Sequence, residues 1–298
     1  MVKYRILCWV NTFIRTTMSE SIFDLLQYSF FTNSLLAALL ASITCGIAGT
    51  YIVARRMVFI SGGITHASFG GIGIAWFLGM NPVAGAAIFS ILSAIGIEFV
   101  SSRSKIREDS AIGILWSLGM ALGIIFIFIT PGYAPNLMSY LFGSILTVGT
   151  TDLWLMASLA LFLAVFFAGF YHLILFIAFD EEYARAHKAP VQLFKYLLIS
   201  LVALTIVLNI RVVGIILVIS FLTIPQSTAN LFTNNFRSII FLSILIGIIG
   251  SISGLLVSYF WNIPSGATII FAFVLIFGIA KTVQSLMIRS DIRKQLDK

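Results

Sequence analysis

The residue best suited to chemistry is His66, a histidine inside a strongly apolar segment. It stands in a run of small and hydroxyl residues from Ser61 to Gly71. A neutral imidazole is the commonest side-chain ligand of transition metals, and an ionisable side chain at membrane depth is a functional candidate. The sequence therefore predicts His66 as a metal contact, with Thr65 and Ser68 as weaker candidates. The alternative is structural, because small residues also let helices pack tightly around a histidine that is satisfied by hydrogen bonds.

A second group of polar residues forms the charged connector from Phe179 to Val191. Acidic residues occupy its first turn and basic residues its last, which complements a helix dipole, and Pro190 ends the pattern. We predict a short helix that docks onto a partner, and the alternative is a solvated connector. The residues expected to form the docking surface are Asp180, Glu181, Glu182, Tyr183, Ala184, Arg185, Ala186 and Pro190.

The sequence carries no GxxxxGK[ST] phosphate loop, no HExxH and no GxSxG motif. We therefore expect a chain that is not an enzyme and binds no cofactor of its own. A gradient-driven carrier usually keeps charged residues inside its spans. Here Glu98, Asp152 and Arg211 lie at span ends, where side chains can extend to the membrane interface. The energy therefore comes either from an ion gradient acting on buried charges or from a separate ATPase subunit, which would bind the ATP and dock on a cytoplasmic loop.

The elements that must position these residues are membrane-spanning helices. The chain has 298 residues, of which 60% are hydrophobic and 10% charged, with a mean hydropathy of +1.07. Its apolar runs are as long as the roughly 20 residues that cross a bilayer. We predict an all-α, polytopic integral membrane protein of about eight to nine transmembrane helices, with a broken or re-entrant helix near Pro225. The expected spans are 30–54, 58–78, 83–100, 111–130, 153–178, 193–210, 212–231, 238–260 and 266–288.

The positive charge of the chain, a net +7, is distributed as a topology signal. Basic residues separate the apolar runs instead of forming one face, which argues against nucleic-acid binding. The loops near 55–56, 103–107, 185–195 and 237 are basic and alternate with nearly uncharged ones. By the positive-inside rule, the basic loops and the C-terminus are cytoplasmic.

The N-terminal segment interrupts this pattern, because Lys3, Arg5 and Arg15 would fall on the outer side. We expect an over-extended start, with translation beginning at Met18. The predicted organisation is a leader of residues 1–29, a single transmembrane domain of residues 30–288 and a cytoplasmic tail of residues 289–298.

Six segments, in the same order, resemble the membrane permeases of ABC transporters for zinc, manganese and iron. Each segment alone is a weak match, but the ordered set covers nearly the whole chain. The segments are Arg55-Arg56 to His66-Ala67, Glu108 to Gly113, Ser139 to Leu146, Phe179 to Val191, Val213-Gly214 to Pro225 and Ala229, and Pro264 to Thr268.

The resemblance implies a homodimeric permease that imports a divalent metal ion across the cell inner (cytoplasmic) membrane. Two cytoplasmic ABC ATPase subunits would dock on the helices at 179–191, and an extracytoplasmic metal-binding protein would deliver the ion. His66 matches the pathway histidine of the family. Two positions depart from the pattern: Gly62 replaces an aspartate one turn before the histidine, and His187-Lys188 replace the Leu-Gly that usually ends the docking helix.

Three functions remain open at this level. The first is an ATP-driven permease for zinc, manganese or iron. The second is an ABC permease for a metal chelate or cobalamin-like ligand, which needs a wide apolar vestibule where an ion needs a narrow polar path. The third is a gradient-driven secondary transporter, which ATP dependence would distinguish from the other two.

Overall fold

The described part of the chain, residues 27–103, 107–131 and 145–296 of a computed structural model, is built from helices without strands. Eight of these helices are long and apolar enough to cross a membrane. The predicted all-α polytopic fold is therefore confirmed. The helices are α3 Ser29–Ala54, α4 Val58–Phe77, α5 Pro82–Arg103, α6 Glu108–Ile129, η1 Ile145–Thr147, α8 Thr150–Gly169, α9 Tyr171–Phe179, α10 Glu181–Ala186, α11 Val191–Val213, α12 Ile215–Ala229, α13 Phe236–Trp261 and α14 Ser265–Leu296.

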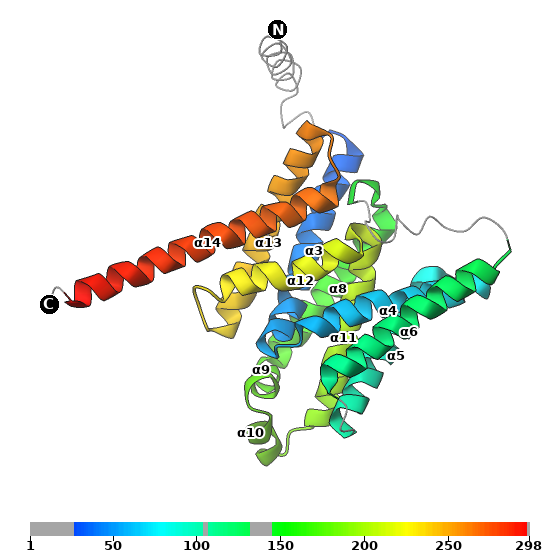
Figure 1. Ribbon diagram of the computed structural model, residues 1–298, viewed down its shortest axis with the longest axis horizontal. Coiled ribbons are helices and arrows are strands. Elements are labelled where there is room, and N and C mark those ends of the chain that lie inside the picture. Colours follow the sequence, from blue (N-terminus) through cyan, green and yellow to red (C-terminus); the bar gives the residue numbers. More distant parts are fainter. Residues whose placement is uncertain (1–26, 104–106, 132–144, 297–298) are drawn as a thin grey trace, which may run out of the picture.

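The helices form a central group flanked on two sides. The largest cluster of buried apolar side chains is made chiefly by α3, α8, α11 and α12. Helices α4, α5 and α6 pack against one another on one side, and α14 extends away on the other, where it contacts α12 and α13 (Figure 1). Most of α14 is exposed, as expected for an apolar helix that faces lipid or another membrane subunit.

The broken or re-entrant helix predicted near Pro225 is interrupted earlier, at Gly214, and α12 continues through Pro225. Helix α11 ends at Gly214, whose φ of 84° favours glycine, and α12 is only 15 residues long. Pro225 cannot donate to the carbonyl of Phe221 because it has no N–H. The side chain of Gln226 donates to that carbonyl (3.0 Å) and to the carbonyl of Cys45 on α3 (2.8 Å). The buried amide thus replaces the hydrogen bond that Pro225 cannot make and fixes α12 to α3.

Two further expectations need adjustment. The single span predicted at 153–178 is divided at Phe170 into α8 and α9. The tail predicted at 289–298 continues α14 as far as Leu296. The predicted leader, with Met18, lies outside the described residues except for its last three positions, 27–29.

Loops with the same predicted side meet at the same end of the molecule. At one end, the guanidinium of Arg237 lies 4.5 Å from the ring centre of Tyr171, and Phe236 contacts Phe179. At the other end, Ser34 donates to the carbonyl of Ile145 at 2.9 Å. The basic segment at 237 and the start of the charged connector at Phe179 therefore share one end, which agrees with the alternation of charge along the sequence.

Candidate metal path and docking helix

His66 lies in the middle of α4 with its ring stacked on Trp116 of α6. The ring centres are 4.2 Å apart and the planes differ by 6°. The Nδ1 atom is buried and has no hydrogen-bond partner among the described residues. A histidine with a purely structural role would satisfy that nitrogen. An unpartnered imidazole nitrogen is what a ligand contact requires.

The hydroxyl groups of Thr65 and Ser68 already donate hydrogen bonds within α4. Thr65 donates to the carbonyl of Ser61, and Ser68 donates to the carbonyl of Thr65 at 2.6 Å. Both residues are buried. Ser68 borders a small cavity of about 20 Å³ together with Val207 of α11, whereas His66 faces α6. Residues two apart point to nearly opposite sides of a helix, so the structure does not bring Ser68 beside His66.

Gly62, which stands where the family has an aspartate, has room for a side chain. A β-carbon added at Gly62 would lie 3.8 Å from Trp116, an ordinary van der Waals distance. Gly62 stands one turn before His66 on the same helical face. No group of three or more histidine, cysteine or acidic side chains is clustered as a metal site in the described residues. In this chain the ring of His66 on α4 therefore faces the indole of Trp116 on α6, without a carboxylate one turn away.

The charged connector forms a separate helix, α10, at the end of the molecule where the basic loops meet (Figure 1). Asp180 caps it by accepting a hydrogen bond from the backbone N–H of Tyr183 at 2.9 Å. Ala184 is buried in an apolar cluster with Ile177, Val191 and Phe194. One face of the short helix is thus fixed to the protein by apolar contacts. The side chains of the connector that remain exposed are those of Phe179, Asp180, Glu182, Tyr183, Arg185, Ala186, His187, Lys188 and Pro190.

One departure from the family pattern lies at the end of α10. Lys188 adopts a φ of 56°, in the left-handed region where glycine is favoured. Its N–H donates to the carbonyl of Arg185 at 2.9 Å, which closes the helix end. The family's glycine fits this backbone without strain, whereas a lysine adopts it at a cost.

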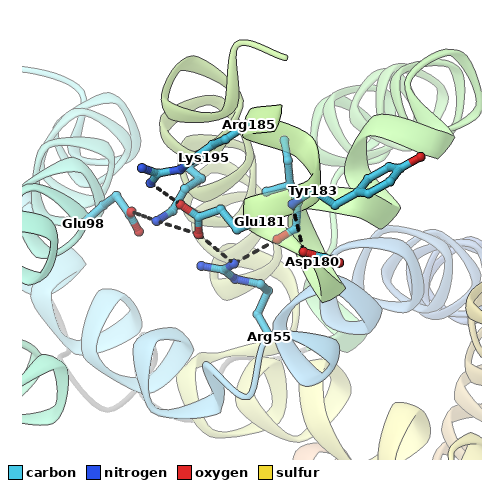
Figure 2. A network of polar contacts seen from close by, with 8 residues as sticks. Arg55, Glu98, Asp180, Glu181, Tyr183, Arg185 and Lys195 are labelled. Atoms are coloured by element: carbon cyan, nitrogen blue, oxygen red, sulfur yellow. Dashed lines mark hydrogen bonds and ion pairs between the residues drawn. The ribbon is translucent and has the colours of Figure 1, made fainter. Parts of the chain in front are cut away.

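Glu181 is the centre of a charge network that sequence reasoning did not foresee. Figure 2 shows its carboxylate facing Arg55, Arg185 and Lys195. The Oε1 atom of Glu181 lies 2.5 Å from Nη2 of Arg185. Its Oε2 atom lies 3.4 Å from Nζ of Lys195 and 3.5 Å from Nη1 of Arg55. The Nζ atom of Lys195 also lies 2.7 Å from the carboxylate of Glu98.

The positive neighbours change the pKa of Glu181. Burial of this carboxyl tends to raise its pKa, but the hydrogen bond from Arg185 and the nearby positive charges outweigh burial. The pKa of Glu181 therefore lies below its ordinary value. At neutral pH the network contains an ionised Glu181.

Glu98 lies near the end of its span, but its side chain does not extend freely. The residue is only 6% exposed and its carboxylate is paired with Lys195. Asp152 and Arg211 lie at span ends as predicted, and their Oδ1 and Nε atoms are 3.0 Å apart. Charge spacing along the chain could not reveal either pair, because the partners come from different helices.

Comparison with known proteins identifies the family. Residues 27–284 match the sequence model described as the ABC 3 transport family. The chain belongs to this family. It is 38% identical over 257 residues to the manganese transport system membrane protein MntC of Halalkalibacterium halodurans, with 86% of this chain and 88% of the relative covered. It is 32% identical over 260 residues to the manganese import system permease protein ScaB of Streptococcus gordonii, with 87% and 93% covered.

A solved structure has the same architecture. PsaBC from Streptococcus pneumoniae, in complex with Fab, superposes with a TM-score of 0.78 at 33% identity. The alignment covers 91% of this chain and 95% of that chain. The permease fold expected from the resemblance is thereby confirmed. Of the six resembling segments, most of Ser139–Leu146 lies outside the described residues.

Proposed function

We propose that this chain is the membrane permease of an ATP-driven importer of divalent transition-metal ions, with manganese, zinc and iron as the candidate substrates. The observation that carries the proposal is the unpartnered Nδ1 atom of His66 in the middle of α4. The manganese systems among its relatives support the same substrate class. A transport path needs ligands that release as well as bind, and a single imidazole meets that need.

The energy source in this proposal is a separate ATPase subunit that docks on α10. The apolar cluster around Ala184 holds the helix, while Glu182 and Tyr183 remain exposed for a partner. By the positive-inside rule, α10 and the C-terminus face the cytoplasm of the inner membrane. ATP binds to the partner, and this chain acts as the transport subunit.

Two further partners complete the proposed transporter. A second copy of this chain forms the other half of the path, so that two His66 residues serve one ion. An extracytoplasmic metal-binding protein supplies high affinity and sets the inward direction. The name of the streptococcal relative, a manganese import system permease, supports import.

The decisive experiment is radiometal uptake by cells that express this chain with its ATPase and binding protein. Saturable uptake of manganese, zinc or iron that disappears with a hydrolysis-deficient ATPase supports the proposal and identifies the substrate. Uptake that persists without ATP hydrolysis would favour a gradient-driven carrier. Absence of uptake for every ion would favour a metal chelate as substrate.

A further inference from the structure

The buried part of the charge network is not explained by docking. Glu98 of α5 and Lys195 of α11 form an ion pair whose side chains are only 7% and 12% exposed. Removing charges from water has a large desolvation cost, so a buried ion pair is not an efficient way to stabilise a fold. The apolar cluster around Ala184 already fixes α10. The buried charges therefore indicate a role other than holding α10 in place.

Lys195 connects two carboxylates on different helices. Its Nζ atom lies 2.7 Å from Glu98 and 3.4 Å from Glu181 (Figure 2). Glu181 begins α10, and Glu98 lies near the end of α5. Arg55, at the end of α3, contacts Glu181 and also donates to the carbonyl of Ile177 at 2.9 Å. A displacement of α10 therefore changes the electrostatic environment of α5.

The next step leads from α5 to the helix of His66. Helices α4 and α5 pack directly against each other. Their backbones meet at Gly71 and Gly85, where a β-carbon on Gly71 would overlap the carbonyl oxygen of Gly85. Such close backbone packing leaves little room for one helix to move independently of the other. Movement of α5 is thus passed to α4.

We propose that Lys195 is a positioning residue that transmits the motion of α10 to α5, and through α5 to the helix of His66, by bridging Glu181 and Glu98. The inference rests on the proposed function, because it assumes that an ATPase moves α10. It adds a specific connection between the docking surface and the metal path. The connection consists of charges rather than of the apolar contacts that hold α10 in place.

The test measures coupling, using the complete transporter reconstituted in liposomes. Glu98→Gln and Lys195→Met each remove one partner, and metal uptake is divided by ATP hydrolysed in the same vesicles. We expect ATPase association to be unchanged, and metal transported per ATP to fall roughly tenfold, within the usual range for coupling between two sites. The double variant should lose no more than either single variant, because the two residues act as a unit.

Two controls separate transmission from a general loss of structure. Lys195→Arg keeps the charge and should retain most of the coupling. Asp109→Asn disrupts an exposed ion pair with Arg107, whose atoms are 3.8 Å apart, and should leave coupling at the wild-type value. Metal transport per ATP within about twofold of wild type in both single variants would overturn the inference, since smaller changes fall below ordinary site coupling.

Two other outcomes are also decisive. Loss of the assembled complex in both single variants would make the pair a folding element and would overturn the inference too. Failure of the proposed function is a different result, in which the wild-type complex transports no metal or does not bind an ATPase at all.

Discussion

The most informative single perturbation of the docking helix is the substitution Asp180→Ala. Asp180 is the N-cap of α10 and accepts the N–H of Tyr183 at 2.9 Å. Helix α10 has six residues, far below the length at which an isolated helix is stable in water. Its first turn therefore depends on this cap as well as on the apolar contacts of Ala184.

The size of the expected change in ATPase affinity follows from the free-energy cost of losing an N-cap. Replacing a capping aspartate by alanine costs about 1 kcal/mol of helix stability. If the ATPase binds only the formed helix, its apparent affinity falls with the fraction of α10 that is formed, so at most this free energy appears in the affinity. We therefore expect the dissociation constant of the ATPase for the permease to rise by up to about fivefold, because 1.4 kcal/mol corresponds to about tenfold.

The assay is direct binding of the purified ATPase subunit to permease in lipid nanodiscs, at fixed ionic strength. Asp180→Asn is the matched control, because asparagine caps a helix about as well as aspartate but carries no charge. It should bind the ATPase nearly as tightly as wild type. Unchanged affinity in Asp180→Ala would refute the docking role of α10. Equal weakening in both variants would show that the charge, and not the cap, contacts the ATPase.

Three further predictions concern other positions. Gly62→Asp should raise the transport of manganese relative to zinc, because manganese favours carboxylate oxygens, whereas Gly62→Ala, which adds only a β-carbon, should leave the ratio unchanged. Lys188→Gly should stabilise the protein by about 0.5–1 kcal/mol, as relief of the left-handed backbone exceeds the entropy cost of glycine; a lower melting temperature would contradict this. Glu181→Gln should lower the melting temperature at pH 7, with the difference from wild type vanishing at acidic pH. The pKa of Glu181 is depressed in the folded protein, so its stabilisation is present above the ordinary carboxyl pKa and is lost as the pH falls through the folded value. A difference that is independent of pH would refute the role of its charge.

The sequence predicted the features that depend on local pattern. Apolar runs of bilayer length predicted the spans, and the short link after the span at 193–210 predicted an interruption, which the structure has at Gly214 between α11 and α12. The short helix α10 was predicted from the order of charges in the connector. These features are readable because the physical cause lies within one segment of the chain.

The features that were missed depend on contacts between segments. Trp116 stacks on His66, but α6 and α4 are about 50 residues apart in the chain and nothing in either run specifies the pairing. The pairing of Glu98 with Lys195 was missed because Lys195 was used only as a signal of membrane topology. A span-end carboxylate and a basic loop on the same predicted side were the available signal for that pair.

The most direct test of the central claim is metal transport by the reconstituted transporter carrying His66→Ala. The control is His172→Ala, which alters an exposed histidine on α9. The complex with His66→Ala should assemble and hydrolyse ATP but transport far less metal, while the complex with His172→Ala should transport as wild type does. Undiminished metal transport by His66→Ala would contradict the account and remove this histidine from the path.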